Sequence, residues 1–328
     1  MAEAFHDHFI VRRPELADLD AVAALINACA QADIGEDSHI TASWLGRVWT
    51  VPSFDPNADA WLVTTRDGRL AGYADFGLAD PPQPFEVSGW VHPDFRGRGI
   101  GAYLLRRVEE RAQHTIAIAA PDVWLGLQTS VYASSAAARE LLRHNGYVEV
   151  RRWLRMLIEM DAPPPAARLP DGITLRAFRR GEEDRAVYEA VEDAMADEWE
   201  HPALSYEIWR HYKIDQEPNF DPTLWFLAVD GDQIAGVAIC RWERPGKPNH
   251  GHVRDLGVRR PWRRRGIALA LLQHAFGEFY RRGKLRVSLG VDATSLTGAE
   301  RLYLKAGMRA DLETSIYEKE LRPGKREK

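Results

Sequence analysis

Apolar residues follow first a strand-like and then a helix-like pattern at the start of this chain. Alternation over residues 9–13 predicts a strand, and the apolar face of residues 21–28, which follow Asp18 and Asp20, predicts an amphipathic helix with an acidic cap. Residues 60–78 predict a hairpin of two strands that turns at a short polar stretch.

The same order returns in the second half of the chain. Residues 173–176 match the first strand, and residues 224–236 match the hairpin, at a spacing of roughly 160 residues that is typical of one domain. The other elements predicted in the two halves are a helix ending near His114, strands at 123–129 and 285–291, helices at 134–145 and 299–307, and a final strand pair at 147–159. This order predicts an α/β fold (an α+β mixed sheet) that occurs twice.

A proline-rich segment separates the two repeats. Residues 161–170 contain four prolines, which disfavour a regular ladder and favour an extended linker. We therefore expect an N-terminal domain at 1–160 and a C-terminal domain at 171–322. The charged tail, residues 323–328, is expected to fray.

Composition limits the classes of function. The 328 residues carry a net charge of -5, which argues against a general nucleic-acid binder, because such proteins present a basic face to phosphates. Cys29 and Cys240 are too few for a disulfide framework or a cysteine metal site, and buried thiols are expected. The sequence shows neither a secretory signal nor a membrane-spanning apolar run, so we expect a cytoplasmic protein that does not bind membranes.

One short motif occurs at the same place in both halves. Each copy is an apolar strand end, a basic turn with glycine, and the start of a helix. Such a turn offers backbone amides and the positive end of a helix dipole to an anion, and glycine lets a phosphate approach the main chain. The residues expected to make this site are Gly89, Trp90, Val91, Arg96, Gly97, Arg98, Gly99, Ile100 and Gly101 in the first half, and Leu256, Gly257, Val258, Arg263, Arg264, Arg265, Gly266, Ile267 and Ala268 in the second.

The detail of the motif resembles one protein superfamily. The first copy reads Val-x-Pro-x-x-Arg-Gly-x-Gly-Ile-Gly, and the second reads Val-x-x-Pro-x-Arg-Arg-x-Gly-Ile-Ala. Both are similar to the acyl-CoA loop of the GCN5-related N-acetyltransferases (GNAT). Neither copy has the Lys-Ser/Thr of a nucleotide-triphosphatase loop or the Gly-x-Gly-x-x-Gly of a dinucleotide fold. The resemblance implies acetyl-CoA as a cofactor and two tandem GNAT domains, each a splayed, mostly antiparallel sheet flanked by helices.

The resemblance also implies a general acid and an oxyanion donor. The family acid is a tyrosine in a motif like Ala-x-x-Leu-Tyr-x-x-x-Gly, and Tyr303 falls on that position. The first half has Leu142 there, and leucine donates no proton, so the first domain is expected to be non-catalytic while still able to bind acetyl-CoA. The family's oxyanion donor is a backbone N–H at the strand end formed here by residues 256–258.

The general base is less well specified by the sequence. The family glutamate, counted six residues back from the last valine of the strand, is replaced by His252, and Asp255 is a second candidate. The same count gives Phe85 in the first half, next to Glu86. An asparagine with which the family contacts the cofactor is replaced by Ser295.

An acidic and aromatic stretch in the second half is a candidate for amine recognition. It contains Glu192, Asp193, Asp197, Glu198 and Trp199, in the region from which the family builds its acceptor site. Carboxylates and an indole ring attract a cationic amine. The alternative is a solvated helix end.

Doubled GNAT chains of this length are similar to the mycothiol synthase group, in which only the C-terminal domain turns over. The resemblance therefore implies transfer of an acetyl group to the primary amine of a small molecule or a peptide. Two alternatives remain open: an acyl-CoA-binding sensor without turnover, and an aminoacyl transferase of the doubled GNAT type. The sequence names neither the acceptor nor the oligomeric state.

Overall fold

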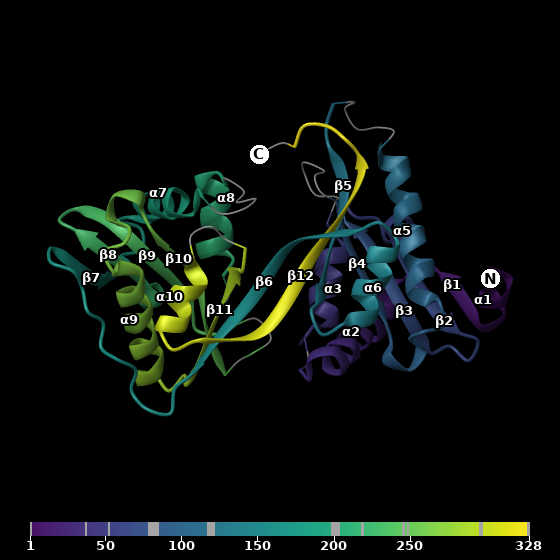
Figure 1. The fold of residues 1–328 in the computed structure, drawn as a ribbon, viewed down its shortest axis with the longest axis horizontal. Coiled ribbons are helices and arrows are strands. Elements are labelled where there is room, and N and C mark those ends of the chain that lie inside the picture. The colour runs from purple at the N-terminus through teal and green to yellow at the C-terminus, as the bar shows by residue number, and fades with distance from the viewer. Residues whose placement is uncertain are drawn as a thin grey trace. The chain divides into compact units, whose positions relative to one another are not determined.

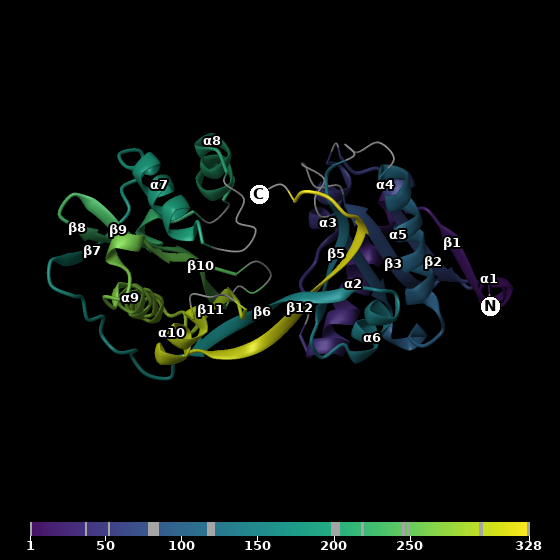
Figure 2. The same cartoon turned by 45° about the horizontal axis from the view of Figure 1, so that its top comes forward.

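The computed structural model (Figures 1 and 2) describes residues 2–36, 38–51, 53–77, 85–116, 122–197, 204–217, 220–244, 247, 249–294 and 298–326. Its contacts divide the chain into two compact units. The N-unit comprises Met1–Arg152 and Glu313–Glu327, and the C-unit comprises Trp153–Leu312.

The sheet of the N-unit has the order β1-β2-β3-β4-β5-β12. Its strands are β1 (Phe9–Arg12), β2 (Ala60–Thr65), β3 (Leu70–Gly77), β4 (Phe85–Val91), β5 (Leu125–Tyr132) and the second part of β12 (Arg309–Arg322). Neighbours pair antiparallel except β4 and β5, which run parallel. This is the mixed, mostly antiparallel sheet that the sequence predicts.

The sheet of the C-unit repeats this arrangement in the order β6-β11-β10-β9-β8-β7. Its strands are β6 (Val148–Glu159), β7 (Ile173–Ala177), β8 (Trp225–Asp230), β9 (Gln233–Arg241), β10 (His250–Val258) and β11 (Arg286–Asp292). Only β10 and β11 pair in parallel. The two predicted hairpins are confirmed as β2–β3 and β8–β9.

The last strand of each half completes the sheet of the other unit. From Trp153 to Glu159, β6 pairs with β11 of the C-unit, whereas β12 pairs with β5 of the N-unit from Thr314 to Arg322. The units therefore differ from the consecutive domains at 1–160 and 171–322 that we expected. Residues 161–170 carry no helix or strand, as expected for a linker, but they belong to the C-unit.

Two further expectations for these terminal strands are wrong. Residues 148–159 form one strand rather than a strand pair, because the stretch contains no glycine, proline or asparagine at which to turn. The described part of the tail is tied down: the Lys325 carbonyl accepts from the Trp124 amide at 3.0 Å, and Arg326 pairs with Glu318 at 2.7 Å.

Helices cover both faces of each sheet. In the N-unit they are α1 (Ala2–His8), α2 (Leu19–Ile34), α3 (Ala42–Trp49), α4 (Pro56–Asp59), α5 (Ile100–Ile116) and α6 (Ala136–His144). One core joins α2 and α3 to Leu62 and Tyr73, and the other joins α5 to Phe76 and Phe85. Cys29, on α2, is a buried free thiol whose pKa burial raises to about 11.

The C-unit is covered in the same way. Its helices are α7 (Asp184–Met195), α8 (Tyr206–Arg210), α9 (Ile267–Arg281) and α10 (Ala299–Lys305), with a π-helical turn at His211–Asp215. Val187 and Trp209 pack with Leu227 on one face, and Leu271 and Phe276 pack on the other. As in the N-unit, the two faces have separate cores.

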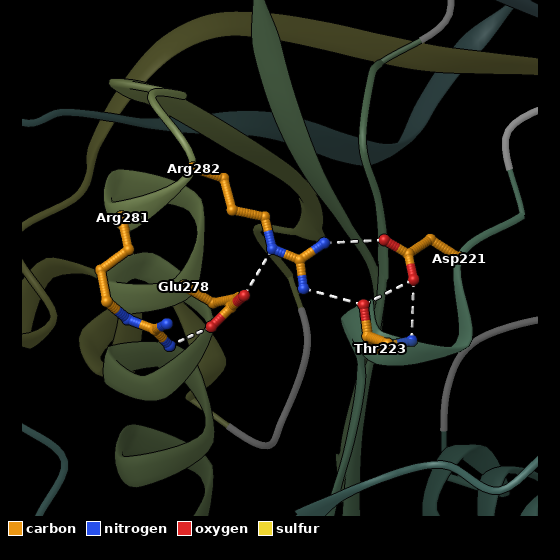
Figure 3. Close-up of polar contacts among 5 residues, drawn as sticks. All are labelled: Asp221, Thr223, Glu278, Arg281 and Arg282. Carbon is orange, nitrogen blue, oxygen red and sulfur yellow. Dashed lines mark hydrogen bonds and ion pairs between the residues drawn. The ribbon is translucent and has the colours of Figure 1, made fainter.

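A polar cluster fixes the end of α9 (Figure 3). Buried Glu278 accepts from Arg281 and Arg282, and Arg282 also donates to Asp221 at 2.7 Å and to Thr223 at 2.8 Å. These bonds tie the helix to the turn that precedes β8.

Candidate active site

The parallel pair of strands separates at a defined point in each unit. In the C-unit, β10 pairs with β11 at residues 250–252, the last pair being His252 with Ser288. Beyond it β10 stays paired with β9 while β11 stays paired with β6. In the N-unit, β4 and β5 separate after Glu86 and Gln128. Along residues 253–258, the amides that point away from β9 therefore face an opening rather than a strand.

The basic loops lie at these openings and have the same backbone shape. Gly97 and its counterpart Arg264 have φ of 75° and 63°, and Gly99 and Gly266 have φ of 81° and 87°. A Cβ added at either Gly99 or Gly266 would meet no protein atom within 4 Å. Glycine adopts this left-handed backbone without strain. The absence of a side chain also leaves open space before the helix N-terminus, where a phosphate can bind.

The first arginine of each loop is bound to its own unit. Arg96 donates to Asp33 at 2.7 Å and to the Val91 carbonyl at 3.3 Å. Its counterpart Arg263 donates to Asp197 at 2.6 Å and to the Val258 carbonyl at 2.9 Å. The equivalent contacts in both units indicate that this arginine shapes the loop.

The other loop arginines are more open to a ligand. Arg98 makes a long bond to the Asp94 carbonyl at 3.3 Å, and Arg265 makes one to the Asp171 carbonyl at 3.2 Å and a loose ion pair with Asp230 at 3.7 Å. Arg264 is exposed, and the described chain offers it no hydrogen bond or ion pair. Its charge is thus available at the mouth of the loop.

Two acidic residues assigned to the amine by the sequence instead contact this loop. Asp193 pairs with Arg259 at 2.6 Å, and Asp197 pairs with Arg260 and Arg263, which lower the pKa of Asp197 to about 2. The contacts therefore do not support a role in amine attraction for either carboxylate. Glu192 has an interaction of its own, while Glu198 and Trp199, like Ser295, lie outside the described residues.

Gly257 has a structural reason to be glycine. A Cβ there would lie 2.6 Å from the Ala194 Cβ and 2.8 Å from the Met195 Cε. Helix α7 therefore approaches β10 closely at this residue. At Gly89, one residue before Trp90 on β4, an added Cβ would meet nothing within 4 Å.

A β-bulge in the C-unit changes the equivalence of the two halves. The β9–β10 register shifts between Val253 and Asp255, so Arg254 is an extra residue, whereas β3 and β4 pair without a shift. Counting through the bulge makes Glu86, not Phe85, the counterpart of His252. The β4–β5 and β10–β11 registers give the same answer, since both residues end the parallel pairing.

His252 is held as a neutral imidazole. Its Nδ1 lies 3.1 Å from the Ser288 carbonyl oxygen, which can only accept, so Nδ1 carries the proton and Nε2 keeps a lone pair. Burial, followed by the positive charges of Arg244 and Arg241, lowers the pKa of His252 to about 4. His252 lies within β10, on the strand from which it was counted.

Asp255 is engaged by a lysine. Its two carboxylate oxygens accept from Lys213 Nζ at 2.9 and 2.6 Å, and burial lowers the pKa of Lys213. The bulge at Arg254 places Asp255 on the α7/α8 face of the sheet, together with His252, although the two are three residues apart. His252 thus keeps Nε2 as an acceptor, whereas both carboxylate oxygens of Asp255 accept from Lys213.

Tyr303 lies on α10, the helix that follows β11. It is buried in the core of the C-unit. Its carbonyl accepts from the Met308 amide at 3.0 Å, and the Leu142 carbonyl accepts from the Tyr147 amide at 3.0 Å. This matching helix end confirms that Leu142 is the N-unit counterpart of Tyr303.

The two matching units correspond to two matches with one known protein family. The acetyltransferase (GNAT) family pattern matches residues 20–147 and 185–308. The chain belongs to the GNAT family. It is thus an N-acetyltransferase, of a family that uses acetyl-CoA, and the family pattern covers both predicted repeats.

Full-length GNAT relatives share both halves. Mycothiol acetyltransferase of Salinispora arenicola is 34% identical, with 90% of each chain covered, and that of Geodermatophilus obscurus is 30% identical, with 90% of this chain and 92% of the relative covered. A GCN5-related N-acetyltransferase structure from Sphaerobacter thermophilus has a TM-score of 0.82 at 41% identity, covering 97% of this chain and 98% of that one. A tandem GNAT protein from the clavulanic acid pathway shares the fold at a TM-score of 0.68 and 16% identity, with 97% and 100% covered.

The sequence analysis did not single out several polar residues near Asp255. Lys213, Glu217, Arg241 and Arg254 line a space beside Asp255 on the α7/α8 face. Arg254 is the extra residue of the bulge, and a break in strand alternation was the only sequence signal for it. Within the described residues there is neither a helix suited to cross a bilayer nor a cluster of side chains suited to hold a metal.

Proposed function

We propose that this protein transfers the acetyl group of acetyl-CoA to the primary amine of a small molecule or peptide, with the chemistry in the C-unit. The observation that carries the proposal is the separation of β10 from β11 after His252 and Ser288, with the glycine loop at one side and the helix of Tyr303 following β11. The full-length relatives named mycothiol acetyltransferase support acetyl transfer.

The residues present fit acetyl-CoA. The open space at Gly266, the amides at the start of α9 and the exposed Arg264 suit its pyrophosphate. When bound, the thioester supplies an activated acetyl carbon. Backbone amides of residues 256–258 that face the opening donate to the carbonyl oxygen as negative charge develops on it.

Two side chains manage the protons. Tyr303 donates its phenolic proton to the leaving sulfur. His252 Nε2 accepts from the incoming amine, directly or through a water. Because the pKa of His252 is about 4, this imidazole is a weak base, and it serves mainly to orient an amine that arrives already neutral.

The N-unit is proposed to hold acetyl-CoA without turning it over. Its loop has the same backbone shape, with open space at Gly97 and Gly99. Leu142, in place of Tyr303, supplies no proton to a leaving thiolate. Glu86 lies where the β4–β5 pairing ends, as His252 does in the C-unit, but Leu142 leaves it without a general acid for the leaving group.

The test is release of CoA thiol from acetyl-CoA with a panel of primary amines. Tyr303→Phe should lower kcat by about a hundredfold or more and change acetyl-CoA affinity less than about threefold. Tyr280→Phe, on α9, is the matched control and should retain turnover. Unchanged kcat in Tyr303→Phe would reject the acid role.

The same assay separates the alternatives. Tight acetyl-CoA binding without thiol release for any amine would favour the sensor. Absence of acetyl-CoA binding in calorimetry would favour an aminoacyl transferase.

A further inference from the structure

Arg254 is a largely buried cation with almost no internal partner. It is the extra residue of the β10 bulge, and its side chain is 23% exposed. Within the described chain its contact is a single one, from Nη1 to Glu217 Oε2 at 3.5 Å. A guanidinium has five N–H donors, so most of them lack an acceptor. Burial of a cation whose donors mostly lack acceptors is costly, and an anion that accepts from those donors offsets the cost.

The carboxylate that contacts Arg254 is already shared, and the other carboxylate near it, Asp255, is held by Lys213. The same oxygen, Glu217 Oε2, forms a closer ion pair with Arg241. Arg241 in turn has a buried Nε without an acceptor in the described structure. One negative charge therefore faces two guanidinium groups, which leaves the group formed by Glu217, Arg241 and Arg254 with a surplus positive charge.

The neighbouring charges do not remove this surplus. Lys213 and Asp255 neutralise each other, and Asp221 is paired with Arg282 (Figure 3). The space lined by these groups, about 10 Å³, holds one water or one oxygen of a larger anion. It lies on the face of the sheet that carries His252, and Arg241 lies opposite His252 in the β9–β10 register.

The N-unit shows that the fold does not require these cations. Its strands have Gly77 at the position of Arg241 and, without a bulge, no residue at the position of Arg254. The same face carries two carboxylates instead, Asp75 and Glu86, and burial raises the pKa of Asp75 to about 6. The positive surplus is therefore a property of the C-unit.

We propose that the acceptor of the C-unit is an amine that also carries an anionic group, a carboxylate or a phosphate, which Arg254 and Arg241 bind beside His252. Arg254 is then a specificity-determining residue, because it distinguishes an anionic acceptor from the corresponding neutral amine. This inference rests on the proposed function, since it names the acceptor class of the same site.

Two matched pairs of acceptors test the inference with the full-length protein. L-Tyrosine differs from tyramine by a carboxylate, and phosphoethanolamine differs from ethanolamine by a phosphate. The wild type should show a kcat/KM at least about tenfold higher for the anionic member of one pair, and that pair identifies the group. Arg254→Gln should reduce this preference about tenfold and leave kcat/KM for the neutral member within about twofold.

Arg179→Gln, which removes the same charge from an exposed site of the C-unit, is the control and should keep the preference. The inference is overturned if the neutral member is the better acceptor in both pairs. It is equally overturned if Arg254→Gln lowers both members alike, which a purely structural role predicts.

A binding measurement separates this inference from the proposed function. N-Acetyl-L-tyrosine and N-acetyltyramine are titrated into the wild type and Arg254→Gln in the presence of CoA. Preference for the acid that depends on Arg254, without any turnover, would support the anion site while rejecting the acetyltransferase proposal for these amines. If the protein releases thiol but shows no such preference, the anion site is overturned and the acetyltransferase proposal stands.

Discussion

The buried imidazole of His252 predicts a specific loss of stability in acid. Its folded pKa of about 4 lies below the unfolded value of 6.5, mainly because burial disfavours the charged form. Between these values the unfolded chain binds a proton that the folded chain does not. The contribution of His252 is therefore fully present above a pH of about 6.5 and is lost as the pH falls toward 4. The stability lost amounts to about 2 kcal/mol at a pH of about 5 and to about 3 kcal/mol once the pH is below 4.

The measurement is urea denaturation of the wild type and His252→Asn at a pH of about 7.5 and of about 5. Asparagine can still donate to the Ser288 carbonyl but does not titrate. Burial also lowers the pKa of His250 and His274, yet both remain in the two proteins, so their effects cancel in the comparison. The wild type should lose about 2 kcal/mol more than the variant. Parallel losses would refute a buried neutral His252.

Three further substitutions test the loops and strands. Arg264→Gly should raise the free energy of unfolding by about 1 kcal/mol in thermal melts, because Arg264 has a φ of 63°; a lower stability would contradict the strain. Gly257→Ala should cost about 1–3 kcal/mol in chemical denaturation, because the new Cβ would lie 2.6 Å from Ala194; an unchanged midpoint would mean that α7 yields freely. Gly99→Glu should reduce acetyl-CoA bound in calorimetry from about two equivalents to one by blocking the N-unit loop, whereas an unaltered stoichiometry would show that the N-unit was already empty.

Local patterns predicted most elements because each carries its own signal. Gly146 has a φ of 83° and follows α6, and the turn at Gly231 joins β8 to β9, as the residue types indicate. The loop glycines Gly99 and Gly266 were located for the same reason: their left-handed backbone depends on residue type. These are the features for which one short stretch of sequence is sufficient.

The exchange of β6 and β12 had no such local signal. Both halves end in a long strand, and the alternation within a strand says which residues are buried but not which sheet they join. Met156 is fully buried in the C-unit core and Tyr317 in the N-unit core. Either side chain would satisfy the hydrophobic pattern in its own half, so the pairing partner is decided by contacts between residues far apart in sequence.

The bulge explains why the candidate site was read only in part. Counting back from Val91 and Val258 assumes equal strand lengths, and Arg254 adds one residue to the second strand. That single residue moves the counterpart of His252 from Phe85 to Glu86. It also puts a guanidinium on the α7/α8 face at the point where the strands separate. The two units thus differ most, in both register and charge, at the residues beside the proposed reaction, and the C-unit has both the bulge and Tyr303.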